Sequence, residues 1–246
     1  MSTLTAVILD KSYLQGCKAE ELLRLAQTHR LIVSDALFYE LLTTDPVARS
    51  RCFAKFPTGT NPVELFSHIG TMMRAEIDTH KASDLPSQHC HDFPFTFNPA
   101  LVTPTYALPP EANVHIAAQT AQLRKDVVDF LERVKLIPDL FPKLLTGTTE
   151  ERLFTRASAE ATIVSPYGLL PFYSQLEPPP NESALPPAES ITQDWALYRW
   201  LQIQLLFALD VYIRYQGVSP DLSKPKVYKR IEHDVLDFHV LNRPGF

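Results

Sequence analysis

The chain has 246 residues, of which 45% are apolar, so it can build one large domain or two small ones around a buried core. Its formal net charge of −5 excludes a protein whose whole surface attracts nucleic acid, although a local basic patch is compatible with that charge. The three cysteines are widely spaced and form no CxxC pair, which supports neither a disulfide framework nor a cysteine zinc site. We therefore expect the reducing cytoplasm as its compartment.

Neither a leader nor a membrane span is predicted. The apolar run of residues 5–9 is too short for the core of a signal peptide, and Asp10 interrupts it. The most apolar window covers residues 195–213, but it is a poor candidate to cross a bilayer, so we expect a soluble protein without a membrane partner. The polar and charged side chains within that window are Arg199, Gln202, Gln204 and Asp210.

Two short apolar runs near the N-terminus bracket a segment with helical spacing. Residues 5–9 read Thr-Ala-Val-Ile-Leu and end at Asp10, and residues 31–33 read Leu-Ile-Val. Between them, residues 18–29 place leucines at helical spacing, with Glu20 in the first turn, where the helix dipole favours an acid. Continuous apolar strands are typical of a parallel sheet that is buried on both faces. The pattern predicts two adjacent parallel strands joined by a helical crossover.

This N-terminal pattern carries two acids, Asp10 and Glu40. Asp10 stands at the carboxyl end of the first strand, the sheet edge at which ligands bind in open α/β folds. Ser34 or Asp35 caps the helix after the second strand, and Glu40 lies nearly two turns into that helix. Because the helix begins just beyond the end of the second strand, we expect Asp10 and Glu40 to approach each other.

The middle of the chain is predicted to be helical scaffold interrupted by a loop. Residues 47–56 and 62–80 are predicted helices, the second with a proline in its first turn. Residues 82–110 contain frequent prolines and no periodicity, which indicates a long loop. The loop includes His-Cys-His-Asp at residues 89–92. Consecutive side chains point in different directions and no partner cluster with zinc spacing follows, so a metal role is not favoured there.

The second half is predicted to be mainly helical. An amphipathic helix over residues 111–137 ends before Pro138, and another covers residues 149–163 behind a turn at Gly147. Prolines return in residues 166–187, which should form an extended connector on the surface.

The strongest helical pattern covers residues 190–215, which are apolar almost all round. A helix of that kind is usually buried in the centre of a domain, so we expect other helices to surround it and Trp200 to be buried.

A last predicted helix, residues 226–241, carries Asp234 and Asp237. Their i, i+3 spacing places both on one helix face. Magnesium and manganese ions favour carboxylate oxygens and usually retain water, so a few clustered acids suffice to hold them. A solvated charged face is the other interpretation of such a pair.

The order of these features resembles the PIN domain, a family of metal-dependent ribonucleases. In that family the first acid ends the first strand, the second lies on the helix after the second strand, and the third opens a later helix. The matching residues are Asp10 in Val-Ile-Leu-Asp-Lys-Ser, Glu40 in Ser-Asp-Ala-Leu-Phe-Tyr-Glu-Leu-Leu, and Asp234 in His-Asp-Val-Leu-Asp-Phe-His. The family normally continues into another strand and a further acid, which have no counterpart before Phe246; Asp237 could replace that acid.

The resemblance implies an α/β fold, with a PIN-like small parallel sheet and a large helical complement. It also implies one domain over residues 1–246 with a helical insertion over residues 45–190. The implied activity is hydrolysis of RNA phosphodiester bonds, in the setting of a bacterial toxin or defence effector. The implied ligands of Mg²⁺ or Mn²⁺ are Asp10, Glu40, Asp234 and Asp237.

Several side chains near these acids could orient them or contact RNA phosphates. Ser12 and Ser34 are also explained by ordinary turn and cap chemistry, and the basic residues by ordinary surface charge. The alternative function is a catalytically inactive, PIN-like helical protein that binds a protein partner or a second copy of itself. The candidate substrate-binding residues are Ser12, Ser34, Lys11, Lys229 and Arg230.

Overall fold

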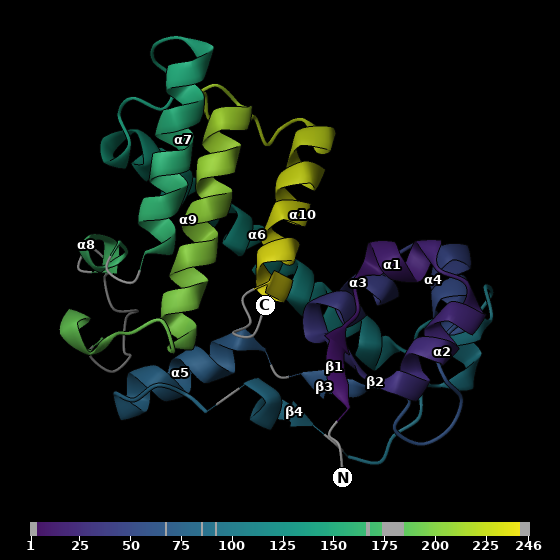
Figure 1. Cartoon of the computed structure of the whole chain (residues 1–246). Helices are drawn as coiled ribbons and strands as arrows, with labels where there is room; N and C mark the ends of the chain where they lie inside the picture. Colours follow the sequence, from purple (N-terminus) through teal and green to yellow (C-terminus); the bar gives the residue numbers. More distant parts are fainter. Residues whose placement is uncertain are drawn as a thin grey trace. The chain divides into compact units, whose positions relative to one another are not determined.

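The computed structural model describes residues 4–66, 68–84, 86–91, 93–165, 168–173 and 185–241. The chain divides into two compact units that interleave along the sequence. The first consists of Met1–His68 and Leu85–Ala121, and the second of Ile69–Asp84 and Gln122–Phe246. Helices predominate and a small, mainly parallel sheet is present, so the predicted helix-rich α/β fold is confirmed (Figure 1). A single domain with an insertion over residues 45–190 stays a prediction.

The sheet belongs to the first unit and has the strand order β1-β2-β3-β4. The first three strands are parallel, with Val7 opposite Leu31 and Ser34 opposite Phe66, whereas β4 pairs with β3 in the antiparallel direction. The carboxyl ends of β1, β2 and β3 therefore lie along one edge of the sheet. The strands are β1 (Thr5–Ile8), β2 (His29–Ser34), β3 (Glu64–Phe66) and β4 (Cys90–His91).

Side-chain caps fix where the helices of the first unit begin. Asp10 and Ser34 each accept backbone N–H groups of the helix that follows, and Asp45 does the same for a helix that opens with proline. The backbone N–H of Lys18 donates to Glu21, which forms part of a capping box. These caps begin α1 (Lys11–Gly16), α2 (Ala19–Thr28), α3 (Asp35–Thr43) and α4 (Pro46–Phe53).

The proline-rich segment predicted as a loop helps to build the core of the first unit. Besides two short 3-10 helices, η1 (Pro86–His89) and η2 (Pro99–Val102), it supplies β4 and several phenylalanines. The Phe97 ring stacks on Phe38 at a centroid distance of 6.2 Å and meets Phe53 edge-on at 5.3 Å. Burial of these rings orders a segment that has no periodicity of its own.

The prediction of one helix over residues 62–80 is wrong. The segment instead forms β3 and then α5 (Ile69–Thr79). Residues 64–66 are Glu-Leu-Phe and pair with residues 32–34 of β2. Tertiary pairing thus overrides a local pattern in which proline marked the start of a helix.

The second unit is helical. Its core helix α9 (Ala196–Arg214) packs against α5, α7 and α10, so the expected ring of helices around it is confirmed (Figure 1). The remaining elements of this unit are α7 (Thr149–Val164), α8 (Leu170–Tyr173), η3 (Ala188–Ser190), α10 (Pro225–Leu241) and the part of α6 (Pro110–Leu140) from residue 122 onward.

Two details of these helices differ from the predictions. Helix α6 continues through Pro138 because Ile137 is fully buried and its carbonyl accepts the N–H of Phe141 at 2.9 Å, which closes the last turn. Trp200 is only half-buried, and the guanidinium of Arg133 lies 4.8 Å from the centre of its ring. None of the helices in the described ranges is long and apolar enough to cross a membrane.

Candidate functional site

Asp10 stands just beyond β1, where the chain turns into α1. The backbone N–H of Leu9 still donates to the carbonyl of Ile32 at 2.9 Å, so the pairing with β2 continues up to the acid. Oδ2 of Asp10 then accepts the N–H groups of Ser12 at 2.8 Å and Tyr13 at 3.4 Å. The exposed carboxylate is therefore held at the carboxyl edge of the sheet as the N-cap of α1.

The residue next to Asp10 contacts the second predicted acid. Nζ of Lys11 lies 3.4 Å from Oε1 of Glu40, and the two side chains are 20% and 10% exposed. Glu40 belongs to the buried face of α3, whereas Lys11 opens α1. The end of β1 and the middle of α3 therefore lie side by side, and a cation is already placed against the buried carboxylate.

The other strand ends carry Ser34 and Asp35, which the sequence named as candidate caps, and His68, which it did not single out. Ser34, at the end of β2, is 1% exposed and its hydroxyl accepts the N–H of Leu37 at 3.0 Å, which is the cap role. The next residue, Asp35, places Oδ2 3.8 Å from Nε2 of His68, which follows β3. Sequence reasoning missed this pair because β3 itself was not predicted.

In the second unit, Asp234 forms an ion pair with an arginine. Its carboxylate accepts Nη1 of Arg214 at 2.7 Å and Nη2 at 3.3 Å. Asp210 accepts from the same guanidinium and also lies 3.6 Å from Arg156. Although burial lowers the pKa of Arg214, the hydrogen bonds to Asp234 and Asp210 outweigh it and raise that pKa above its ordinary value.

The remaining predicted residues lie on the exposed side of α10. Asp237 and Arg230 are exposed, and Lys229 lies 3.5 Å from Glu232. A hollow of about 540 Å³ runs beside the first three turns of α10. Its lining residues are Pro225, Lys226, Lys229, Arg230, His233 and Asp234.

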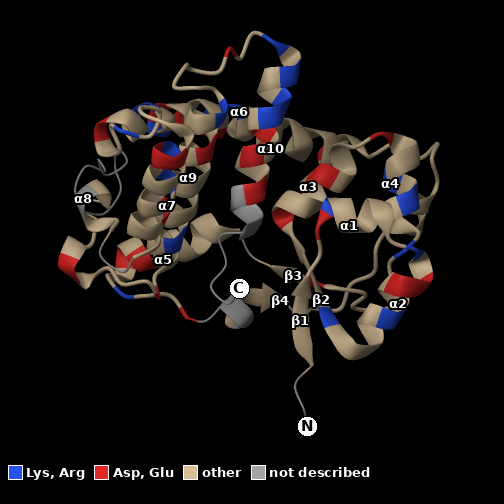
Figure 2. Ribbon diagram, turned by 45° about the horizontal axis from the view of Figure 1, so that its top comes forward, with Lys and Arg blue, Asp and Glu red and all other residues tan. Residues whose placement is uncertain are grey.

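The four predicted metal ligands divide between the two units, with Asp10 and Glu40 in the first and Asp234 and Asp237 in the second. Acidic residues accordingly appear on both α3 and α10 (Figure 2). Within the described ranges no group of three or more His, Cys, Asp or Glu side chains is arranged to hold a metal ion. Asp92 of the His-Cys-His-Asp run lies outside those ranges. A joint site of all four acids stays a prediction.

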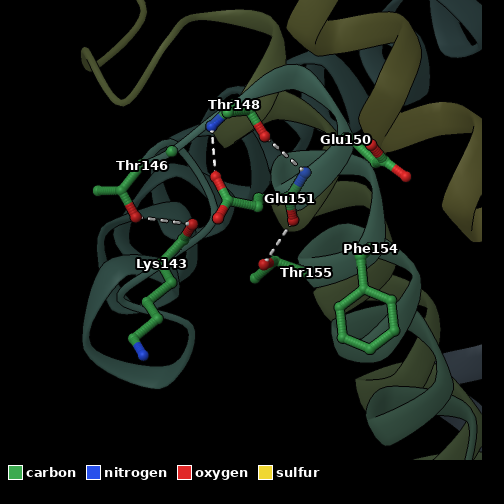
Figure 3. A pocket seen from close by; sticks show the side chains of 8 residues that line it. Lys143, Thr146, Thr148, Glu150, Glu151, Phe154 and Thr155 are labelled. Carbon is green, nitrogen blue, oxygen red and sulfur yellow. Dashed lines mark hydrogen bonds between the residues drawn. The ribbon is translucent and has the colours of Figure 1, made fainter.

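A second hollow, of about 630 Å³, lies at the start of α7 (Figure 3). Two of its lining residues form the helix cap: Thr148 N–H donates to Oε2 of Glu151 at 2.6 Å, and Glu151 N–H donates to Oγ1 of Thr148 at 3.3 Å. Gly147 turns the chain at φ +84°, and a Cβ there would lie 2.5 Å from Oε2 of Glu151. Two adjacent apolar side chains in the first half of this helix are exposed, Leu153 at 64% and Phe154 at 74%.

No family model, curated protein or solved structure matches the chain. Two candidate surfaces therefore rest on their own geometry. One is the carboxyl edge of the parallel sheet, which gathers charged side chains from successive strand ends. The other is the apolar surface of α7, which carries no chemically reactive arrangement.

Proposed function

We propose that this chain is a PIN-like, metal-dependent ribonuclease, with the carboxyl edge of the parallel sheet as part of its active site. One observation supports the proposal most: the end of β1, with Asp10, lies against the middle of α3, where Lys11 contacts the buried Glu40 at 3.4 Å. Acids at that edge of a parallel sheet stand where open α/β folds bind their ligands.

The carboxylates at this edge are of the chemical kind that binds a hard divalent cation. Carboxylate oxygens are the ligands that Mg²⁺ and Mn²⁺ prefer. Both hydrogen bonds that Asp10 accepts within the described part of the chain end on Oδ2. The cap therefore orients the carboxylate through Oδ2, and in the proposal Oδ1 binds the ion. The Glu40 carboxylate already attracts a positive charge, that of Lys11. In the proposal Asp10 and Glu40 of the first unit hold the ion.

A divalent ion bound there would lower the pKa of an attacking water and stabilise negative charge on the phosphate. The chain's own residues have simpler tasks. The cap of α1 fixes the orientation of Asp10, and burial fixes that of Glu40. Lys11 neutralises Glu40 in the metal-free protein and can contact a substrate phosphate when an ion takes its place. Ser12, Lys229 and Arg230 are the remaining proposed contacts with RNA.

A thermal melt with and without Mn²⁺, run beside an RNA cleavage assay, tests the proposal. Asp10→Asn should abolish both the Mn²⁺-dependent rise in melting temperature and cleavage, because asparagine keeps the N-cap but removes the charged ligand. Asp45→Asn is the matched control, since Asp45 caps α4 in the same way. If Mn²⁺ stabilised Asp10→Asn as much as the wild type, Asp10 would not be a ligand.

The alternative is a non-catalytic protein that binds a partner through α7. The exposed Leu153 and Phe154 favour it, because large apolar side chains adjacent on one helix are typical of a contact surface. Absence of cleavage by the wild type, together with no effect of Mn²⁺ on its melting temperature, would favour this function. For either function we propose a cytoplasmic location, because the three cysteines are widely spaced and form no CxxC pair.

A further inference from the structure

The carboxyl edge of the sheet also holds a histidine beside a carboxylate, apart from the acids considered so far. His68 follows β3 by two residues, and its Nε2 lies 3.8 Å from Oδ2 of Asp35, the first residue of α3. The side chains are 53% and 36% exposed, so both remain accessible to a substrate. Among the described strand ends, three successive ones thus carry a titratable side chain: Asp10, Asp35 and His68.

The register of the sheet places this pair beside the proposed ribonuclease site. Strands β1, β2 and β3 are neighbours in that order, and all three are parallel. Neighbouring strands lie about 4.8 Å apart, so the ends of β1 and β3 are about 10 Å apart with Asp35 between them. Side chains that project from such ends can reach one phosphodiester from two sides.

Resting on the proposed ribonuclease function, we propose that His68 is a catalytic residue: its imidazolium protonates the oxygen that leaves phosphorus, and Asp35 is the positioning residue that holds the imidazolium. Histidine is the side chain most often used for such a proton transfer near neutral pH. The Asp35 carboxylate, 3.8 Å from Nε2, can accept a hydrogen bond from the ring and limits its rotation. The pair therefore supplies what the carboxylates of the metal site cannot, a proton donor at the same sheet edge.

The step balances without any further reactant. The oxygen of water forms a bond to phosphorus, and the bond between phosphorus and the ribose oxygen breaks. The leaving oxygen takes the proton of the His68 imidazolium, and the proton released by the water passes to solvent. His68 regains its proton from solvent before the next turnover, and nothing is oxidised or reduced.

A purely structural role predicts a different outcome. An ion pair at 3.8 Å between half-exposed side chains contributes little to stability, so variants of either residue should fold normally. A general acid matters only when the leaving group needs a proton. Its loss therefore slows cleavage of RNA, whose leaving oxygen is strongly basic, and spares an ester that releases 4-nitrophenolate.

The experiment compares the wild type, His68→Gln and Asp35→Asn on an RNA oligonucleotide and on bis(4-nitrophenyl) phosphate, both with Mn²⁺. We expect His68→Gln to slow RNA cleavage by about 10²- to 10⁴-fold and to leave release of nitrophenolate within a few-fold of the wild type. Asp35→Asn should show the same selectivity with a smaller loss. His115→Gln is the matched control, because His115 is an exposed histidine of α6 in the same unit.

The outcomes separate this inference from the function on which it rests. If the wild type cleaves RNA and His68→Gln loses activity equally on both substrates, or on neither, the proton-donor role is overturned and the ribonuclease remains. If the wild type cleaves neither substrate while Mn²⁺ leaves its melting temperature unchanged, the proposed function fails, and the role of His68 fails with it.

Discussion

The carboxylate of Glu76 caps the helix that begins at Ala196, accepting that residue's backbone N–H at 2.7 Å across 120 positions of sequence. It also accepts the N–H of Leu197 at 2.8 Å and both the N–H and hydroxyl of Ser83, while its side chain is fully buried. Trp195 cannot cap α9 with its own side chain. A carboxylate from α5 therefore accepts the first N–H groups of the core helix. Its negative charge also interacts favourably with the positive end of the helix dipole.

Replacing Glu76 should destabilise the second unit strongly. Glu76→Ala leaves several buried N–H groups without an acceptor, and we expect a loss of about 3–5 kcal/mol in the free energy of unfolding. Glu76→Gln keeps one acceptor oxygen and should cost less. Urea unfolding followed by circular dichroism measures both. Asp139→Asn, an exposed acid of α6, is the control, and a Glu76→Ala curve that overlaid it would refute the capping role.

This cap also explains where the sequence-based boundary of α9 failed. The apolar pattern predicts that the helix begins at residue 190, whereas α9 begins at Ala196, where Glu76 caps it. Glu76 is too distant in sequence for a local pattern to indicate this start. Local signals succeeded where the cap is local. Ser34 was one of two predicted caps of α3, and α7 begins at residue 149 as predicted from the turn at Gly147. Both helices begin there because the side chain of Ser34 or Thr148 accepts a backbone N–H three residues later.

The candidate site was only partly predictable for the same reason. Asp10 and Glu40 follow strong local signals, a short apolar strand and a capped amphipathic helix. His68 follows β3, a strand of three residues that exists because it pairs with β2. Without the prediction of β3, nothing in the sequence distinguishes His68 from the chain's other histidines.

The ordered aromatic segment in the first unit gives a second test of packing. Phe97→Ala should destabilise the protein by about 2–4 kcal/mol, because its ring contacts Phe38, Phe53 and Phe56. Phe93→Ala should cost less than about 1 kcal/mol, since Phe93 is 48% exposed. Chemical denaturation of both variants compares two phenylalanines of one segment. Equal effects would mean that the segment is a surface loop, as its composition alone predicts.

Alkaline pH should weaken the second unit through Tyr173. Burial raises the pKa of Tyr173 to about 12, while its hydroxyl donates to the carbonyl of Pro186 at 2.7 Å. In the unfolded chain the Tyr173 hydroxyl ionises near pH 10. The stabilisation of the folded state by the neutral hydroxyl is therefore fully present below pH 10 and is lost as the pH rises toward 12. In thermal melts across this range, the wild type should lose more stability than Tyr173→Phe, which cannot ionise. Parallel curves for the two proteins would contradict the assignment.

Because Asp234 is paired with Arg214, we expect replacement of Asp234 and replacement of Asp10 to have different effects on the stability of the metal-free protein. Arg214 bridges Asp210 of α9 and Asp234 of α10, so removing Asp234 leaves a partly buried guanidinium with one partner fewer. Asp234→Asn should therefore lower the stability of the metal-free protein by about 1–3 kcal/mol. Asp10→Asn, which keeps its cap and removes a charge from the sheet edge, should leave that stability unchanged or raise it slightly.

A double-mutant cycle with Arg214→Met and Asp234→Asn measures the pair directly, and we expect a coupling free energy of about 1–2 kcal/mol. Mn²⁺ then decides whether Asp234 also serves the proposed site. If Asp234 is a ligand, it must exchange Arg214 for the ion, so Arg214→Met should strengthen the Mn²⁺-dependent rise in melting temperature and Asp234→Asn should weaken it. If neither variant changes that rise while the coupling persists, Asp234 is a structural partner of Arg214, and the metal site is confined to the acids of the first unit.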